Sequence, residues 1–546
     1  MPRTTARTLT ARRLNRTRSR TRTAIVVVGA ALSVLTLSAQ APAGLDAATL
    51  ARVREEASTR SKAYEHAWWL AEVFGPRVTG TPAFAKASDW AMEQFSAWGL
   101  SNVHQERWAF GQGWNIDRFS ATQVEPQPAV LIGAPRNFSP STAGVVASEV
   151  VHLKVASEAD LAAHRGTLRG RIVIMQPVRA VRMLEGPVIL RMDDGPWWTE
   201  AATPMERLPQ IQPPAGAAEA AKQRALLNAA IRKFLVDEGV GVLLERGNDA
   251  DTAAGGSDLT WRTQTTDGGT VFPSSGGSRD PKVAAQVPSA TLAVEHYNRL
   301  VRLVERGIPV RMEVEIKTTF HPEGALPNGI NTIAEIPGTD LAHEVVLMGA
   351  HMDGVPYATG ATDNATGTAA MMEAVRAIQA LKLKPRRTIR VVLWGGEEQG
   401  LLGSRAYVAA HYWDAEARKP KPEHANVAGY FNLDNGTGRI RGIWGQANKG
   451  ALPILEKWGE PLKALGWKMA SPRSVSATDH SSFDQVGLPG FQFIQERLEY
   501  NSRSHHSNMD TFDRIQKDDL VQQGTVAAVI AWQAANWPEK LPRKPM

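Results

Sequence analysis

The pattern of apolar and polar residues divides the chain, and its second half alternates apolar runs with helical periodicity. The apolar runs fall at residues 330–336, 345–348, 389–393, 427–433 and 491–494. Short runs of this kind, bounded by glycine, are typical of buried strands. The intervening segment 365–383 places Ala370, Met371, Ala374, Ile378 and Leu381 on one face of a helix. This alternation predicts an α/β fold, a mostly parallel mixed sheet sandwiched by helices.

The first half contains one clear helical segment, residues 84–98. Phe84, Ala87, Phe95 and Trp98 recur at spacings of three and four and therefore share a face. We expect these aromatic side chains to lie in the core. The preceding residues 75–84, GPRVTGTPAF, form a turn-rich connection.

Residues 139–318 have a different pattern of apolar and polar residues. Their β-branched runs at 150–153, 171–175, 240–244 and 310–316 are separated by long loops. The loops 185–216 and 248–281 are rich in Pro, Gly, Ser and Asp, which predicts surface excursions. We interpret 139–318 as an inserted β-rich domain that either shapes the functional site or only stabilises the fold.

The N-terminus has the order of an export signal. The formal net charge is +7, but residues 1–22 hold eight arginines and no acidic residue, so the remainder is slightly acidic and no nucleic-acid-binding surface is implied. The basic block meets an apolar segment at 24–37 and small residues up to 43. A membrane anchor is the alternative, but the segment is shorter than the roughly 20 residues that a span needs. We therefore expect an exported protein, periplasmic or secreted, without a membrane anchor after cleavage.

The predicted organisation has four parts. They are a signal peptide at 1–43, the N-terminal part of a catalytic domain at 44–138, the inserted domain at 139–318 and the catalytic core at 319–546. The chain has no cysteine, which excludes disulfides and thiolate chemistry. Imidazole and oxygen groups remain as metal ligands.

Metal-binding side chains follow several of the predicted strands. His351 and Asp353 come just after the run 345–348, where the carboxylate can hold the imidazole in place. Asp363 precedes the helix 365–383, as an N-cap or as an anion stabilised by the helix N-terminus that can bridge two cations. Carboxyl ends of parallel strands meet at one sheet edge, so these groups can converge.

Glu397 and Glu398 follow the run 389–393 after two glycines. Adjacent carboxylates at an apolar strand end repel each other unless a cation lies beside them. One can then bind a metal while the other takes a proton from the attacking water. Asp434 and His506, each unremarkable alone, complete two imidazoles and three carboxylates, a set that suits zinc.

The ordered motifs GAHMDG, GATDNATG, GGEEQGLLGS, NLDNGTG and HHSNMDT strongly resemble the M28 family of co-catalytic zinc peptidases. Residues 328–515 carry the match. RGRIVIMQP, VDEGVGVLLERG and VPSATLAVEHYNRLVRL resemble the protease-associated domain that is often inserted in such enzymes. The resemblance therefore implies the zinc-exopeptidase fold and two Zn²⁺ ions.

The resemblance also implies residue roles. One zinc takes His351, Asp363 and Asp434, and the other takes Asp363, Glu398 and His506, with Asp363 bridging. Family spacing selects His506 over His505. Glu397 is the general base and later acid, and Asp353 supports His351. ATDHSSFDQVGLPG resembles a family turn in which His480 either stabilises the oxyanion or is structural.

The implied function is an exported dizinc exopeptidase that releases N-terminal residues from peptides. The alternative within the family is a dipeptidase or carboxypeptidase like the plasma glutamate carboxypeptidase group. Glutaminyl cyclases share the fold but use one catalytic zinc, and the complete ligand set argues against them. A non-catalytic binding protein would be expected to have lost ligands, all of which are present here.

Overall fold

The computed structural model describes residues 45, 47–181, 189, 191–192, 196–204, 216–247, 266–273, 276–280, 282–283 and 286–545. The predicted signal peptide, 1–43, lies outside these residues. None of the helices in the described residues combines the length and apolar character needed to cross a membrane.

The first of two large sheets carries the predicted strands of the second half of the chain. Its spatial order is β1 (Ser101–Trp108), β10 (Gly329–Ile336), β12 (Arg387–Trp394), β11 (Leu341–His351), β15 (Val427–Asn432), β18 (Gly490–Gln495), β16 (Ile440–Trp444) and β17 (Met469–Ser471). The central strands β12, β11, β15 and β18 are mutually parallel, whereas β10 pairs antiparallel with β1 and β12, and β16 pairs antiparallel with β18 and parallel with β17. The prediction of a mostly parallel mixed sheet is thus confirmed at the centre of the sheet.

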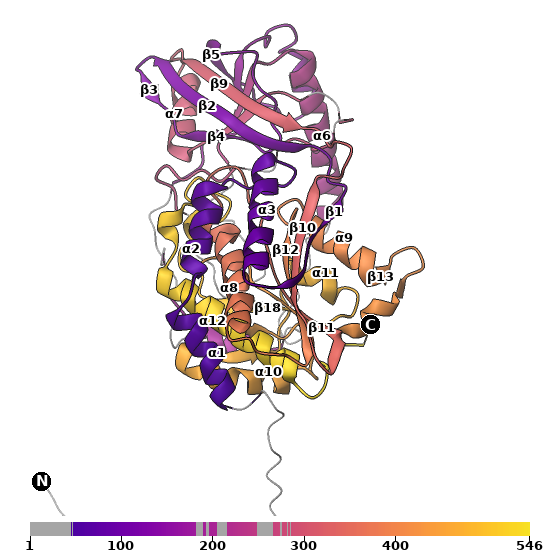
Figure 1. The fold of residues 1–546 in the computed structure, drawn as a ribbon. Coiled ribbons are helices and arrows are strands. Elements are labelled where there is room, and N and C mark those ends of the chain that lie inside the picture. Colours follow the sequence, from indigo (N-terminus) through magenta and orange to yellow (C-terminus); the bar gives the residue numbers. More distant parts are fainter. Residues whose placement is uncertain are drawn as a thin grey trace, which may run out of the picture. The chain divides into compact units, whose positions relative to one another are not determined.

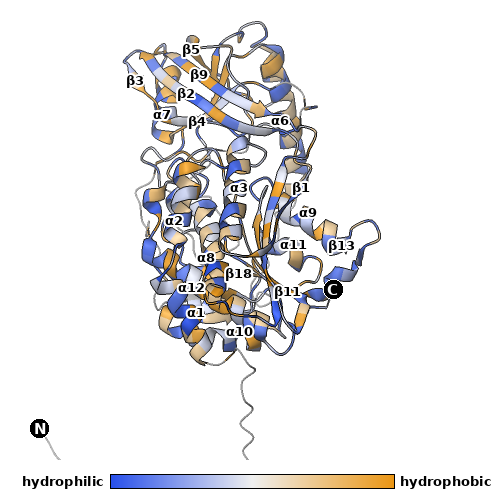
Figure 2. Ribbon diagram, in the orientation of Figure 1, coloured by the Kyte–Doolittle hydropathy of each residue, from blue (hydrophilic) through white to orange (hydrophobic). Residues whose placement is uncertain are grey.

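Helices cover both faces of this sheet. One face packs against α1 (Ala47–Thr59), α2 (Ala63–Trp68), α3 (Pro82–Ala97), α8 (Thr366–Ala380) and α12 (Lys517–Asn536). The other face packs against α9 (Leu402–His411) and α11 (His480–Asp484). Alternation along β11 explains the division, because Val346 and Met348 enter the first core and Leu347 the second. Figure 1 shows the two groups of helices, and Figure 2 shows the apolar strands between them.

The two predicted helices form where expected. Thr81 caps α3 by accepting a hydrogen bond from the Phe84 N–H, and Phe84 and Phe95 are fully buried. α8 differs from an ordinary amphipathic helix, because almost every residue from Thr366 to Ile378 is buried. It lies between the sheet and helices α1, α2 and α12, which leaves it no exposed polar face.

The second sheet includes the strands expected in the inserted domain. Its order is β3 (Ala129–Val130), β2 (Gly113–Glu125), β9 (Arg311–His321), β5 (Val146–His152), β6 (Ile172–Ile174), β7 (Val242–Glu245), β8 (Ser289–Leu292) and β4 (Gly133–Pro135). Only Leu131 and Ile132 separate β3 from β4, so the two edges approach each other as in a barrel. β2, β3 and β4 precede residue 139, where the inserted domain was expected to begin. The helices α4 (Glu158–Ala162), α6 (Ala217–Asp237) and α7 (Val294–Glu305) belong to the same region.

The expectation that both long loops are surface excursions holds at some described positions, such as the exposed Ile189 and Arg191, but is wrong at others. Met192 and Ala201, beside α5 (Pro196–Ala201), are buried against Trp444 and Ile494 of the first sheet. Thr266 and Val271 in the second loop are also buried. The composition predicted an irregular backbone. The polar groups of that backbone can still be buried, because they make hydrogen bonds with the first sheet and its loops.

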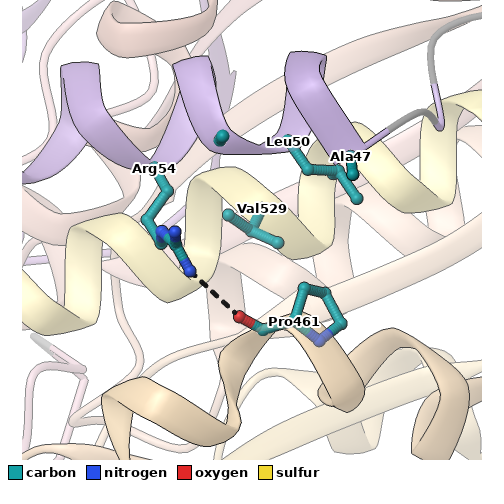
Figure 3. A pocket seen from close by; sticks show the side chains of 6 residues that line it. Ala47, Leu50, Arg54, Pro461 and Val529 are labelled. Carbon is teal, nitrogen blue, oxygen red and sulfur yellow. Dashed lines mark hydrogen bonds between the residues drawn. The ribbon is translucent and has the colours of Figure 1, made fainter.

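A pocket of about 210 Å³ lies between α1 and α12. Its lining is mainly apolar, from Ala47, Leu50, Ala51, Pro461 and Val529, with the Arg54 guanidinium donating to the Pro461 carbonyl at 3.5 Å (Figure 3). None of these side chains is among the predicted site residues.

Candidate metal centre

The five predicted metal ligands meet at one edge of the first sheet. His351 ends β11, Glu398 follows β12, and Asp434 follows β15. Asp363 lies in the turn η3 (Ala361–Ala365) before α8, and His506 follows β18 through the turn η6 (Tyr500–Ser504). Because β11, β12, β15 and β18 are parallel, the segments that follow them emerge on the same side.

Two imidazoles face the two oxygens of one carboxylate. His351 Nε2 lies 3.2 Å from Asp363 Oδ1 and 3.2 Å from Asp434 Oδ1. His506 Nε2 lies 3.2 Å from Asp363 Oδ2 and 2.8 Å from Glu398 Oε2. Asp363 therefore stands between two clusters, each with one imidazole and one further carboxylate. Its backbone at φ −132° and ψ 88° is not helical, and its side chain makes no cap hydrogen bond.

Glycines allow the chain around Asp363 to approach its neighbours closely. Gly360 has φ +63°, a conformation that glycine adopts without strain. A side chain at Gly367 would meet the Leu433 carbonyl oxygen at 2.4 Å, so only glycine permits α8 to pack beside the Asp434 loop. The glycines of GATDNATG are thus explained by geometry.

His505 is the less suitable of the two adjacent histidines. Its Nε2 is 3.7 Å from Asp363 Oδ2, and its ring stacks on His506 with centroids 3.8 Å apart. Burial, followed by the charge of His506, lowers the pKa of His505 to about 3. His505 packs behind His506, against Tyr500.

The electrostatics of the centre are dominated by buried carboxylates. Burial would lower the pKa of His351, but Asp434 and Glu397 raise it well above its usual value. Burial would likewise lower the pKa of His506, but Glu398 and Asp363 raise it well above its usual value. Burial, followed by the His506 and Asp363 charges acting in opposite directions, raises the pKa of Glu398 to about 7.

The donor atoms fit zinc. His351 Nε2, Asp363 Oδ2, both oxygens of Glu398 and Asp434 Oδ1 are buried, and despite the short distances between imidazoles and carboxylates none of these atoms makes a hydrogen bond of regular geometry. Buried polar atoms without partners are rare and call for an explanation such as an ion. Imidazole nitrogen and carboxylate oxygen are zinc ligands, and in three groups within the described residues such atoms lie within 4.8 Å of one another.

Glu397 and Asp353 lie beside the first cluster. Glu397 belongs with His351 and Asp434 to one of the three groups that could hold an ion. Burial raises the pKa of Glu397 well above its usual value, against the opposing charge of His351. The Glu397 N–H donates to Asp353 Oδ1 at 3.3 Å. His351 Nδ1 donates to the Asp353 backbone carbonyl at 3.0 Å, so Nε2 is the nitrogen that faces the carboxylates.

Arg77 is a site residue that the sequence did not reveal. Its guanidinium is fully buried and donates to four carbonyls, those of Met352 (2.9 Å), Thr359 (2.9 Å), Gly360 (2.8 Å) and Leu70 (2.5 Å). It therefore ties together both ends of the connection between His351 and Asp363. Burial lowers the pKa of Arg77 to about 10, which leaves it charged at neutral pH. Arg77 belongs to the GPRVTG turn, but a single arginine in a turn does not predict a buried side chain.

Asp510, at the end of the HHSNMD motif, supports Asp363 from its other side. Its carboxylate accepts hydrogen bonds from the N–H groups of Thr362 (2.6 Å) and Asp363 (3.1 Å). Its backbone carbonyl accepts one from the Thr359 N–H at 3.1 Å. The loop that carries His506 is thus tied to the loop that carries Asp363.

A buried chain of hydrogen bonds joins the ends of three strands beneath the centre. Trp394 Nε1 donates to the Tyr430 hydroxyl, which donates to Asn432 Oδ1, both at 2.6 Å. Asn432 Nδ2 donates to Gln492 Oε1, and Gln492 Nε2 to the Asp434 carbonyl, both at 2.8 Å. This chain fixes the ends of β12, β15 and β18 relative to one another.

His480 occupies a position that favours the structural alternative. Its side chain is fully buried, and burial lowers its pKa to about 4, so the ring is neutral. Nε2 lies 3.1 Å from the Val475 carbonyl, which can only accept, so the single ring N–H points there. No N–H remains for an oxyanion. The neighbouring Asp479, which we did not predict, is fully buried and has no hydrogen-bond partner for either carboxylate oxygen.

Comparisons with known proteins find relatives among peptidases. Residues 331–531 match the family described as Peptidase family M28. Carboxypeptidase Q of Mus musculus is 24% identical over 491 residues, which cover 89% of this chain and 88% of that protein. The solved structure of a peptidase M28 precursor from Shewanella amazonensis SB2B superposes with a TM-score of 0.62 at 23% identity, covering 91% of this chain and 99% of that one. BSAP, a zinc aminopeptidase from Bacillus subtilis, superposes with a TM-score of 0.50 at 17% identity, covering 88% and 97%.

Proposed function

Residues 331–531 are a metallopeptidase domain of family M28, related to exopeptidases, and we propose that the protein is an exported dizinc aminopeptidase. The observation that carries the proposal is the placement of Asp363 between His351 and His506, with Asp434 and Glu398 completing the two clusters. One carboxylate with an imidazole on each oxygen is the arrangement that two neighbouring cations require.

The proposed chemistry assigns each group a task. Zinc ions, when bound, polarise a peptide carbonyl and make water acidic enough to attack near neutral pH. His351, Asp363 and Asp434 hold one ion, and Asp363, Glu398 and His506 hold the other. Glu397 takes a proton from the attacking water on its carboxylate and returns it to the leaving amine. The Asp353 backbone carbonyl keeps His351 in the required orientation.

The charge of the centre favours a substrate with a free amine. Asp353, Asp479 and Asp510 lie around the four carboxylates of Asp363, Glu397, Glu398 and Asp434. Burial raises the pKa of Glu397, Glu398, Asp479 and Asp510, but bound zinc favours their ionised forms. When all seven are ionised, their charge exceeds that of two zinc ions and the Arg77 guanidinium. The excess attracts the ammonium group of a peptide N-terminus and repels a C-terminal carboxylate.

A carboxypeptidase or dipeptidase is the second candidate, because the similarity to carboxypeptidase Q extends over 89% of this chain. A panel of dipeptides, N-acetylated peptides and C-amidated peptides separates the two functions, with bound zinc measured on the same preparation. An aminopeptidase hydrolyses the C-amidated peptides and not the N-acetylated ones. The reverse pattern would establish the carboxypeptidase, and a protein without zinc or hydrolysis would refute both.

Export is proposed on the sequence of residues 1–43 alone. We expect the full-length chain, expressed in a bacterium, to be recovered outside the cytoplasm with its N-terminus close to residue 44. An intact N-terminus on a cytoplasmic protein would contradict this assignment.

A further inference from the structure

The segment 266–271, in the second predicted surface loop, lies against the loop that carries His506. The Thr266 N–H donates to the Ser502 carbonyl at 2.6 Å, and the Thr266 hydroxyl donates to the same oxygen at 3.1 Å. Ser502 lies four residues before His506. Within the described residues, this is one of two places where the segment bonds to that loop.

The second place is Asn508, two residues after His506. Asn508 Oδ1 accepts from the Val271 N–H at 2.8 Å, and Nδ2 donates to the Gly269 carbonyl at 3.2 Å. The Asn508 N–H also points to the Val271 carbonyl, at 3.4 Å. Both ends of the asparagine amide thus bond to backbone groups of the 266–271 segment, a pairing that a hydrophobic or charged side chain of similar size would not reproduce.

The same segment contacts the loop between His351 and Asp363. Tyr357 packs against Val271, Ala134 and Ala293. Val271 is 1% exposed, and its backbone N–H bonds to Asn508. The region of the second sheet therefore contacts both the loop between His351 and Asp363 and the loop that carries His506.

His506 needs external support because its backbone is in the left-handed region, at φ +55°. A residue other than glycine adopts this conformation at a cost of about 1–2 kcal/mol, so the loop would relax if it were free. Asp510 holds the loop on the side of the first sheet. Asn508 holds it on the side of the second sheet, and His506 lies between the two attachments.

We propose that Asn508, bonded to Val271 and Gly269, is a positioning residue that sets His506 for the zinc ion shared with Glu398. The proposal rests on the proposed function, since it concerns one of the two zinc sites. The region of the second sheet thereby contributes to metal binding, because one metal site is complete only when the 266–271 segment is in place.

The test is zinc affinity in Asn508→Ala. Residues that orient metal ligands typically contribute 10- to 100-fold to affinity. We therefore expect zinc titration under a chelator buffer to show one site at wild-type affinity and the other weakened by that factor. Thr266→Val, which removes only the hydroxyl bond, should weaken the same site less. Peptide hydrolysis at limiting zinc should fall in parallel and recover at high zinc.

Asn448→Ala is the matched control. Asn448 is a buried asparagine whose Oδ1 accepts from the Ala451 N–H at 3.2 Å and whose Nδ2 donates to the Pro542 carbonyl at 2.7 Å, away from the centre. It should lose thermal stability and keep both zinc affinities. Wild-type affinity at both sites of Asn508→Ala would overturn the proposal, and so would an equal weakening of both sites in Asn508→Ala and Asn448→Ala. A wild-type protein that binds no zinc would instead overturn the proposed function.

Discussion

Replacement of Arg77 by methionine should damage both the fold and the metal centre. The guanidinium donates to four carbonyls, of which Gly360 also accepts from the Ala365 N–H. Methionine fills the space but donates nothing, so the Met352 and Thr359 carbonyls are left buried without this donor. Each costs about 1–3 kcal/mol, and the free energy of unfolding should fall by roughly 3–5 kcal/mol.

Thermal unfolding followed by calorimetry measures this loss. If roughly 300 residues around the first sheet unfold together, 3–5 kcal/mol corresponds to a fall in Tm of about 5–8 °C. The Met352 and Thr359 carbonyls lie at the two ends of the connection between His351 and Asp363, and a displacement of about 1 Å there can lower the rate about 100-fold. We expect kcat/KM per folded molecule to fall by this factor. Arg77→Lys should be intermediate, because an ammonium group lacks the planar fork.

Arg387→Met is the control for burial alone. Arg387 is 1% exposed, pairs with Glu344 at 2.6 Å and donates to the Trp537 carbonyl, at the end of β12 opposite the metal centre. The Arg387→Met variant should have a lower Tm than wild type while retaining its kcat/KM. The reasoning about Arg77 is refuted if Arg77→Met keeps its Tm within about 1 °C of wild type, or if both variants lose activity equally.

Three further predictions follow from the site and the core. Glu397→Gln should lower kcat by about 10²–10⁴-fold while zinc analysis still finds two ions; wild-type activity would exclude Glu397 as the base. Chelation of zinc should abolish hydrolysis and lower Tm, because an ion held at 1,000 times its Kd stabilises by about 4.1 kcal/mol; added zinc should restore both, and an unchanged Tm would contradict the assignment. Burial lowers the pKa of His66 to about 3, so the folded state stays neutral while the unfolded chain takes up a proton below pH 6.5. Stability should therefore fall between pH 6.5 and 5 by about 2 kcal/mol through this group, and denaturant unfolding of His66→Phe should lack that part of the pH dependence.

The sequence predicted that the proposed zinc ligands gather at one sheet edge, because they follow a repeated local pattern. His351, Glu398 and Asp434 each come shortly after an apolar run, and the run itself identifies the strand. Parallel strands then bring the ligands to one edge without further information. Asp363 could also be identified from the sequence, because glycines and the predicted start of a helix surround it.

Residues that support the ligands were hidden because their contacts join distant segments. Arg77 contacts carbonyls 275 and 283 positions away, and Asn508 contacts Val271 237 positions away. No local periodicity marks such residues. The role of His480 was left open for the complementary reason, since its motif resembles a family turn while its orientation depends on the Val475 carbonyl. A motif identifies the residue type at a position but does not fix the direction of its N–H.

The supporting contacts also explain how loops can hold a precise metal centre. The segments that follow β11, β12, β15 and β18 have no regular pairing at this edge, and each provides one or two ligands. Their relative positions depend on side chains that bond to the backbone of a second segment, as Arg77 does for the Met352 and Gly360 carbonyls and Asp510 for the Thr362 and Asp363 N–H groups. Buried backbone groups require partners in any case. Because the same hydrogen bonds satisfy the loops and hold the segments of His351 and His506 together, we expect this edge of the sheet and the proposed zinc ligands to become ordered together.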